Sequence, residues 1–476
     1  MRTVLRNLAW VWTGLPGQPL IEQAHVSVRD GCIESVQAAP IAGPADEAID
    51  LDGCLLIPGL ISLHHHFFQH VTRAWPGAHR AASEDWLAKL YPVWARMDSQ
   101  DIAAAARNAA AELLLSGTTT AVDHAFLLGA RGDERLAAQL EAVSGLGLRQ
   151  HLVRSGLPGI GARVQARLSP TVVEALIGED HAWLAQCRAD LRRWHDASPG
   201  SMLRLDLGPS NIAYDKPALM SALAALAAEH GCGLHAHYHP RAAERELCRR
   251  LNGVAPIDYL DRAGWLRQGA WFAHCTELDD EEIERFAARA VGIAHCPRTV
   301  LRLGYGMPRL HAWRRAKVKV GIGADGGASN DAGAFIADVR LALLLHRAGG
   351  SDASQWLSPE DALAMATSDA AAILGRPELG AIAPGKRADL AAFDMRGLDV
   401  AGALADPLAG FLLAGSQTRA KLTMVDGRIR VRDGKLVGHD ERAIADETNA
   451  RNRALSDRLP PFPPSRSTRR PAPSGS

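Results

Sequence analysis

Residues 57–69 read IPGLISLHHHFFQ, an apolar run with one turn signal at Pro58-Gly59 that ends in three consecutive histidines. If the run is a β-strand, alternate side chains share a face, so that His64 and His66 point the same way and His65 points the other way. Two imidazoles on one face at this spacing can bind one metal ion. A coincidental histidine cluster is the alternative, and we disfavour it because later parts of the chain supply further ligand residues in order.

Downstream of this stretch, predicted strands alternate with predicted helices. We expect eight strands, at residues 57–63, 118–123, 147–154, 202–208, 232–238, 270–275, 291–296 and 320–325. Helical stretches follow them, among them 101–116, 216–230, 279–290 and 331–348. Eight such units predict a (β/α)8 TIM-type barrel of the α/β class, whose chemistry lies at the C-terminal ends of the strands. A doubly wound sheet is the alternative, which is disfavoured because no GxGxxG motif opens a helix after the first strand.

Both ends of the chain carry strand patterns of a different kind. Apolar and polar residues alternate at 3–13, 21–37, 47–57, 387–394 and 421–438. This alternation is typical of strands with one exposed face. Although the two ends are far apart in sequence, we expect them to pair into one small composite β-sandwich domain.

These patterns divide the chain into expected domains. The β domain would take residues 1–56 and 376–440, and the barrel would take residues 57–375 with one extra helix at 359–375. Residues 441–476 would hold a C-terminal helix and a tail rich in Pro, Arg and Ser. We expect that tail to be disordered, because it has too few apolar residues to form a core.

Composition and charge exclude several classes of protein. The 476 residues are 47% hydrophobic and 22% charged, which is a globular composition. The 53 Lys and Arg balance the 53 Asp and Glu, so neither nucleic acid nor a membrane surface is expected as a partner. No apolar run is long enough to span a bilayer, and no clear signal-peptide cleavage site follows the N-terminus. Seven scattered cysteines without a CxxC pair indicate free thiols and a cytoplasmic location.

Histidine or aspartate stands at the end of five predicted strands. A single histidine at a strand end is more often structural than a ligand. In a barrel, however, the C-terminal ends of all strands meet on one face, where the side chains of an active site gather. The residues concerned are His64 and His66, His235, His237 and His239, His274, His295, and Asp325.

Seven short motifs carry a resemblance to a known family: PGLISLHHHFFQ, SGTTTAVDH, GLHAH, WFAH, GIAHCP, GIGADGGASND and LGAIAPGKRADLAAFD. Together they resemble the amidohydrolase superfamily, in particular its branch of cytosine and guanine deaminases and triazine hydrolases, from about Leu5 to Asp440. Within this branch, HHHFFQ followed by Arg73-Ala74-Trp75 is most similar to members that act on 8-oxoguanine, isoxanthopterin or hydroxyatrazine.

The resemblance implies one divalent metal ion per chain, bound by His64, His66, His237 and Asp325. Three neutral imidazoles and one carboxylate suit Zn²⁺, although the ligands alone also allow Fe²⁺ or Mn²⁺. The ion would lower the pKa of a water molecule and so yield a hydroxide nucleophile. The resemblance further implies that Asp325 accepts the proton of that water and passes it to the leaving group, and that His274 stabilises the tetrahedral intermediate.

The chain departs from the family at one catalytic position. Deaminases of this branch carry a glutamate three residues after the metal-binding histidine of strand 5, whereas this chain has Pro240 there. Three interpretations stay open: His239 replaces the glutamate, the substrate does not need protonation of its ring, or the chain is a degraded copy that binds metal and reacts slowly. His239 suits proton transfer because imidazole titrates near neutral pH. Glu244 and Glu246 lie farther on and are expected to face solvent.

Substrate-binding candidates come mostly from the resemblance. Close relatives read HCPxSN after strand 7, where this chain has Arg298 in place of the usual residues; it is either a clamp for a carboxylate or carbonyl or a surface arginine. Gln69 matches a glutamine that reads a ring carbonyl and its adjacent N–H. The full set of candidates is Gln69, Tyr91, Trp75, His124, Arg154, Ser210 and Arg298.

These observations predict a metal-dependent hydrolase of small molecules. The expected reaction is the removal of an amino or alkylamino group from a nitrogen heterocycle of the purine, pterin, pyrimidine or s-triazine type, with water as the second reactant. The alternatives are hydrolysis of another C–N or C–X bond, such as a ring amide, halide or carbamate, and a metal-binding homologue without activity. The resemblance also implies a homo-oligomer.

Overall fold

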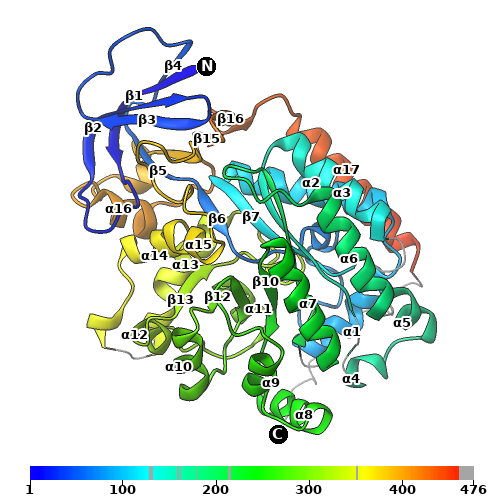
Figure 1. Ribbon diagram of the computed structural model, residues 1–476. Helices are drawn as coiled ribbons and strands as arrows, with labels where there is room; N and C mark the ends of the chain where they lie inside the picture. The colour runs from blue at the N-terminus through cyan, green and yellow to red at the C-terminus, as the bar shows by residue number, and fades with distance from the viewer. Residues whose placement is uncertain are drawn as a thin grey trace, which may run out of the picture.

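The predicted barrel is present. The computed structural model describes residues 1–127, 132–157, 160, 162–177, 180–212, 216–349 and 352–459. Its central parallel sheet runs in chain order through β6 (Leu60–Ser62), β7 (Thr118–Ala125), β8 (Arg149–Arg154), β9 (Leu203–Leu207), β10 (Leu234–Tyr238), β11 (Ala270–His274), β12 (Gly292–His295) and β13 (Lys319–Ile322). The first and last strands meet where the Leu63 N–H donates to the Ile322 carbonyl at 2.9 Å. Helices surround this sheet (Figure 1).

Helices cover the barrel between successive strands, as the alternation predicted. α2 begins with a capping box between Asp98 and Asp101 and ends before Gly117, whose φ of 84° suits glycine. The larger covering helices are α1 (Ser83–Trp94), α2 (Ser99–Leu115), α3 (Gly132–Leu146), α6 (Asp180–Trp194), α7 (Pro217–His230), α8 (Ala242–Asn252), α10 (Asp280–Ala288) and α13 (Phe335–Leu345). The shorter ones are α4 (Ala162–Gln165), α5 (Pro170–Leu176), α9 (Pro256–Arg262), α11 (Pro297–Leu303) and α12 (Leu310–Arg315).

The single helix predicted at 359–375 is two helices, α14 (Pro359–Met365) and α15 (Ser368–Ile373). They separate at Thr367, whose φ of −139° and ψ of −91° are not helical. Its hydroxyl donates to the Leu363 carbonyl at 2.7 Å. A threonine side chain that bonds the backbone in this way offers an alternative to the regular helix ladder, which propensity alone does not reveal.

The two ends of the chain pair into one nine-stranded sheet beside the barrel, as predicted (Figure 1). The junction is the antiparallel pairing of β5 with β14, in which Leu56 lies opposite Ala392. The strands are β1 (Arg2–Val11), β2 (Ile21–Arg29), β3 (Cys32–Gln37), β4 (Glu47–Asp50), β5 (Cys54–Pro58), β14 (Leu390–Asp394), β15 (Leu422–Val425), β16 (Arg428–Arg432) and β17 (Lys435–Leu436).

The predicted strand 57–63 is divided at Gly59 between the two sheets. β5 ends at Pro58 in the β domain, and β6 starts at Leu60 in the barrel. A Cβ atom at Gly59 would lie 2.2 Å from the Thr119 side chain, so only glycine lets the chain pass this close to β7. The chain therefore changes sheets at the residue before β6, the strand that leads into the histidine run.

The C-terminal helix α17 (Glu441–Asp457) packs along α2 (Figure 1). Its Asn452 side chain donates to the Val71 carbonyl at 2.7 Å, and its Leu455 is fully buried. It therefore contacts the segment that follows the histidine run. The predicted disordered tail lies outside the described residues.

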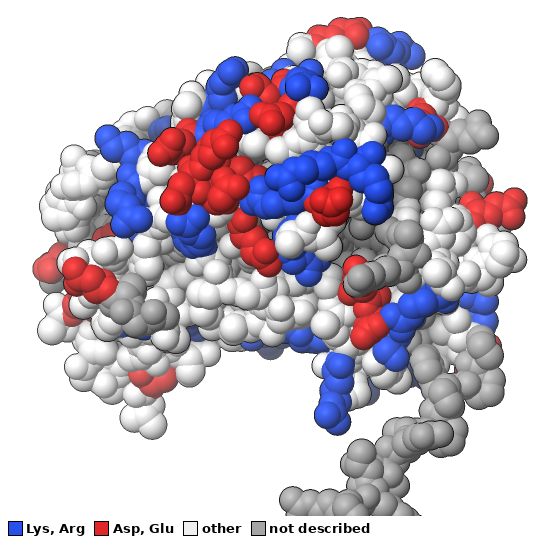
Figure 2. Space-filling view, turned by 90° about the horizontal axis from the view of Figure 1, so that it is seen from below, with Lys and Arg blue, Asp and Glu red and all other residues white. Residues whose placement is uncertain are grey.

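The mixed charges of the surface and the free cysteines agree with the balanced charge and the scattered cysteines of the sequence. Basic and acidic side chains lie next to one another on the face in Figure 2. All seven cysteines belong to the described part of the chain and are free thiols. None of the described helices is both long and apolar enough to cross a membrane.

Candidate metal centre

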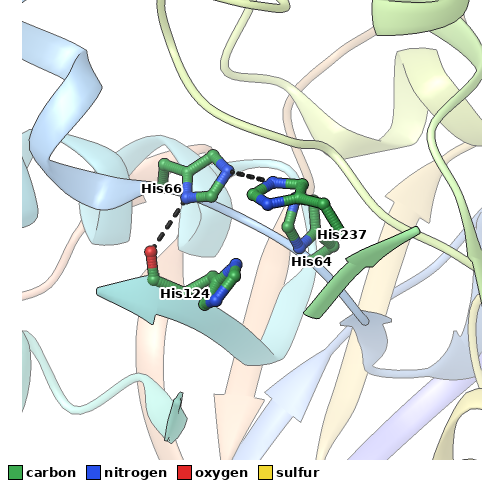
Figure 3. Close-up of side chains that lie close together, drawn as sticks. All are labelled: His64, His66, His124 and His237. Carbon is green, nitrogen blue, oxygen red and sulfur yellow. Dashed lines mark hydrogen bonds between the residues drawn. The ribbon is translucent and has the colours of Figure 1, made fainter. Parts of the chain in front are cut away.

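Buried histidines and one aspartate gather at the C-terminal ends of the barrel strands. Two sets have ligand atoms within 4.8 Å of one another, and they share His64. One set comprises His64, His66, His124 and His237, and the other comprises His64, His274 and Asp325. Figure 3 shows the four histidines of the first set, which come from the segment after β6, from β7 and from β10.

A chain of hydrogen bonds fixes the tautomer of His64. The Nδ1 of His235 lies 2.8 Å from the Trp271 carbonyl, which can only accept, so this nitrogen carries a hydrogen. The Nε2 of a neutral His235 is then an acceptor, and it receives the Nδ1 hydrogen of His64 at 2.7 Å. The Nε2 of His64 is left with a lone pair, and it is buried without a protein partner. Such an atom is suited to bind a metal ion.

The rings of His66 and His237 are fixed in the same way. The His66 Nδ1 donates to the His124 carbonyl at 2.9 Å, and the His237 Nδ1 donates to the Ser210 carbonyl. Both Nε2 atoms therefore carry lone pairs, and they face each other at 3.1 Å (Figure 3). Two acceptors do not bond each other, whereas two nitrogens on one tetrahedral zinc ion lie about 3.3 Å apart. The donor set fits a shared cation.

Asp325 completes the set with a carboxylate. Its Oδ1 lies 3.4 Å from the His66 Nε2 and 3.6 Å from the His64 Nε2, and its Oδ2 lies 3.7 Å from the His274 Nε2. Burial alone would raise the pKa of Asp325, but the neighbouring histidines and the Gly326 N–H outweigh it and keep this pKa below its ordinary value. Burial lowers the pKa of His64 and His66, which keeps both rings neutral. Three neutral imidazoles and a carboxylate are a donor set that zinc accepts.

Two of the polar residues at this centre have strained backbones. His274 has a φ of 72° and Asp325 a φ of 62°, and Cys275 next to His274 has a φ of 53°. Residues other than glycine rarely adopt these left-handed conformations, and each one costs of order 1–3 kcal/mol. Such strain concentrates where the surrounding fold holds a side chain in a required direction.

A family model described as "Amidohydrolase family" matches residues 55–430, a span that includes every barrel strand and all of these candidate ligands. The chain belongs to the amidohydrolase family. A relative named 8-oxoguanine deaminase, from Pseudomonas aeruginosa, is 35% identical over 460 residues, which cover 96% of this chain and 99% of that protein. Hydroxydechloroatrazine ethylaminohydrolase from Pseudomonas sp. strain ADP is 32% identical, with 91% of each chain covered.

A solved structure shares the fold closely. Atrazine chlorohydrolase from Arthrobacter aurescens TC1, complexed with zinc, superposes on this amidohydrolase with a TM-score of 0.88. The two sequences are 31% identical, and the match covers 94% of this chain and 100% of that chain. The family resemblance predicted from the motifs and the barrel fold predicted from the alternation of strands and helices are therefore confirmed.

His235 is a residue of this amidohydrolase whose part in the centre the sequence analysis did not assign. It holds His64 rather than an ion, and its ring stacks on Trp271 with centroids 4.8 Å apart. A hydrogen-bond partner of this kind orients a metal ligand and raises its basicity. The sequence did contain a signal that His235 lies at the centre, because His235 and His237 are two residues apart on one strand and so share a face.

Beside the metal ligands, His274 and His239 form a stacked pair. Their ring centroids are 4.5 Å apart with planes inclined by 20°, and His237 stacks on the other side of His274 at 5.5 Å. His239 is buried, and burial, followed by the neighbouring His274 and Arg241, lowers its pKa well below the ordinary value. The structure thus brings all three predicted catalytic residues, Asp325, His274 and His239, to one place.

The expectation that Glu244 faces solvent is wrong. Its side chain is only 15% exposed and lines a small cavity together with His239, Asn211 and Cys248. Burial raises the pKa of Glu244 to about 7. Glu244 and Cys248 are four residues apart on α8 and so share a helix face, a spacing that would have indicated this position. Glu246, by contrast, is exposed as expected.

Gln69 lies beside the candidate metal centre, but its side-chain oxygen already accepts hydrogen bonds from the protein. This oxygen accepts from the Ala328 N–H at 3.1 Å and from the Ser329 hydroxyl at 3.4 Å. Both donors belong to the turn after Asp325. Gln69 therefore ties the turn of the carboxylate ligand to the segment of the histidine ligands, and any reading of a substrate would fall to its amide N–H groups.

The aromatic candidates lie in one buried cluster next to His66. Tyr91 and Trp75 belong to it, as do Phe68 and Phe126. Phe126, which was not predicted, packs edge-on against His66 with centroids 5.1 Å apart. These rings form an apolar wall beside the metal ligands, and a direct contact of Tyr91 or Trp75 with substrate stays a prediction.

The remaining candidates have partners within the protein. Arg154 donates to Asp190 of α6 at 2.6 Å, on the helix side of its strand, and Arg298 donates to the buried Asp338 at 3.2 Å. Ser210 uses its carbonyl to hold His237, and the His124 Nε2 bonds the Pro209 carbonyl at 3.0 Å. These contacts support structural roles for Arg154 and Arg298, and bracing of the metal ligands for Ser210 and His124.

Proposed function

We propose that this amidohydrolase binds one zinc ion and removes an amino or alkylamino group from a nitrogen heterocycle of the purine, pterin, pyrimidine or s-triazine type. The observation that carries the proposal is the convergence of three imidazole lone pairs, of His64, His66 and His237, with the carboxylate of Asp325. The names of relatives that cover nearly the whole chain support the class of substrate.

Two residues would handle the reacting water and the developing charge. A bound divalent ion makes water acidic enough to supply a nucleophile near neutral pH. Asp325 holds one oxygen toward His66 and the other toward His274, so it can take a proton on one side and release it on the other. His274, kept neutral by burial, which lowers its pKa to about 3, can donate a hydrogen bond to the oxygen that becomes negatively charged.

His239 is our candidate for the proton carrier that replaces the missing glutamate. Pro240, at the position of the glutamate, has no side-chain donor or acceptor. The His239 imidazole lies against His274 and so borders the place where the substrate ring would react. An imidazole can accept a proton at one nitrogen and donate one from the other.

A second candidate reaction is displacement of a substituent other than an amine, such as chloride. Pro240 favours this reaction, because a good leaving group departs without a proton donor at that position. The likeness to atrazine chlorohydrolase, at 31% identity and a TM-score of 0.88, supports it as well.

Product analysis on a panel of heterocycles tests both reactions. Zinc-loaded protein would be assayed for ammonia, alkylamine and chloride release from aminopurines, aminopterins, aminopyrimidines, amino-s-triazines and chloro-s-triazines, with Asp325→Ala as the control. Release of an amine that disappears in Asp325→Ala supports the proposal, and release of chloride alone supports the second candidate. No release of any product from metal-loaded protein contradicts both.

A further inference from the structure

Tyr305 forms a wall over the stacked pair His239 and His274. Its ring packs edge-on against both, with centroids 4.4 Å from His239 and 5.4 Å from His274. Helix α11 ends just before it, since Gly304 has a φ of 66° and the Tyr305 N–H donates to the Val300 carbonyl at 3.0 Å. Tyr305 therefore borders the reacting groups, although no motif indicated it.

The Tyr305 side chain is held at this position from another part of the chain. It hydrogen-bonds the side chain of Ser83, the first residue of α1. The ring thus bridges the loop after α11 and the start of α1, above the two histidines. A ring fixed at both edges is a rigid surface against which a flat substrate can be placed.

Arg241 places a positive charge next to this wall. It directly follows Pro240, occupies the N-cap position of α8, and has its guanidinium carbon 5.8 Å from the centroid of the Tyr305 ring. Its ion pair with Glu244 is long, at 3.7 Å, and its side chain is 34% exposed.

A guanidinium with one long ion pair and a partly exposed side chain can also meet a group from outside the protein. It prefers oxygen acceptors that bear negative charge, which it binds through two parallel N–H groups, and an aromatic ring beneath it keeps it in plane. The arginine at 298, which the sequence suggested as such a clamp, bonds the buried Asp338 instead. Arg241 also lies next to His239 and His274, but its one ion pair among the described residues, with Glu244, is long and therefore weak.

We propose that Arg241 and Tyr305 recognise an oxo or carboxylate substituent on the heterocycle, and so select oxidised or acidic ring systems over their unsubstituted counterparts. This inference rests on the proposed function and narrows its substrate class. Arg241 acts in binding, so its removal affects KM more than kcat.

Pairs of compounds that differ by one oxo group test the inference. We would measure kcat and KM of zinc-loaded wild type and Arg241→Gln for 8-oxoguanine and guanine, isoxanthopterin and pterin, and ammeline and melamine. The control is Arg249→Gln, an exposed arginine on the same helix. Tyr305→Phe, which keeps the ring, and Tyr305→Leu, which removes it, test the wall, and melting temperatures show whether each variant is folded.

The expected result is a selective loss. Arg241→Gln should raise KM for the oxo member of a pair by at least about tenfold, as for loss of a hydrogen bond to a charged group. It should leave KM for the other member within about twofold, and Arg249→Gln should resemble wild type. Tyr305→Leu should reproduce the loss, and Tyr305→Phe should not.

Other results overturn the inference. An equal rise of KM for both members of a pair, or no rise for either, would show that Arg241 does not read the oxo group. If wild type turns over none of the six compounds, the proposed function fails. Calorimetric binding of the same pairs to zinc-loaded protein then decides whether the protein still selects the oxo compounds. Equal affinity of wild type for both members of every pair would reject the selection itself.

Discussion

The Nε2 atoms of His66 and His237 lie 3.1 Å apart, and both carry lone pairs because each Nδ1 donates to a backbone carbonyl. The two lone pairs repel each other, and a cation bound between them removes the repulsion. The folded chain should therefore bind metal far better than the unfolded chain. At a free metal concentration 1,000 times the Kd, binding adds about 4 kcal/mol to the free energy of unfolding.

This relationship predicts the effect of metal removal. Protein treated with a chelator should melt several degrees lower than zinc-loaded protein, and stepwise addition of zinc should restore the melting temperature at one equivalent. Elemental analysis gives the stoichiometry, and His66→Ala, which lacks one of the two nitrogens, serves as the control. An unchanged melting temperature after metal removal would contradict a structural link between the ion and the fold.

His235 should control metal affinity without binding the ion. His235→Phe keeps a ring to stack on Trp271 but removes the acceptor for the His64 Nδ1 hydrogen. Loss of such a partner typically weakens metal binding by about 10–100-fold. The control is His65→Phe, an equally buried histidine that stacks on His70 away from the ligands. Competition with a chromogenic chelator measures both variants, and an equal loss in the two would exclude a specific role for His235.

Gly208 should be essential for the position of His237. A Cβ atom at this glycine would lie 1.7 Å from the backbone oxygen of His235, so an alanine must push β10 away from β9. We expect Gly208→Ala to lose most bound metal and to unfold at a clearly lower temperature. The matched control is Gly145→Ala in α3, where a Cβ meets no atom within 4 Å. Metal content equal to wild type in Gly208→Ala would show that the strands adapt.

The sequence predicted what depends on periodicity within one element. Alternation along an extended segment predicted that His64 and His66 lie on the side opposite His65, although β6 itself ends at Ser62, and five polar strand ends indicated where the site lies. The junction between the two ends of the chain followed from their shared alternation. These inferences need only the period of a strand and the geometry of a barrel.

Contacts between distant elements could not be predicted in this way. Spacing shows which residues share a face, but it does not show that Arg154 meets Asp190, that Arg298 meets Asp338, or that Tyr305 leans over His274. Each of these depends on how loops of different length return to the barrel. The same reason explains Glu244, since the polar sequence of α8 does not reveal that this one side chain of its first turn is covered.

Glu244 should make stability depend on pH. Burial raises its pKa from 4.5 to about 7, so between these pH values the folded protein holds a proton that the unfolded chain has lost. Its contribution to the free energy of unfolding therefore falls as the pH rises from about 4.5 to about 7, and it stays low above that. Glu244→Gln removes this dependence.

Denaturant unfolding at several pH values checks this expectation. Glu244→Gln should be more stable than wild type by about 3 kcal/mol at pH 8 and should match it below about pH 4.5. Glu246→Gln, at an exposed position on the same helix, should change little at either pH. A stability difference that does not vary with pH would show that Glu244 titrates normally.

His239 should be required for turnover and not for metal binding. Its ring lies against His274 at 4.5 Å, whereas the ligand nitrogens are those of other histidines, so His239→Ala should keep one zinc ion per chain. If it carries the proton to the substrate, kcat should fall by about two orders of magnitude or more. The fall should be largest for substrates with a poor leaving group such as an amine, and small for a chloride, which leaves unprotonated. An unchanged kcat for amine release, in a variant with full metal content, would remove His239 from the mechanism and favour substrates that need no ring protonation.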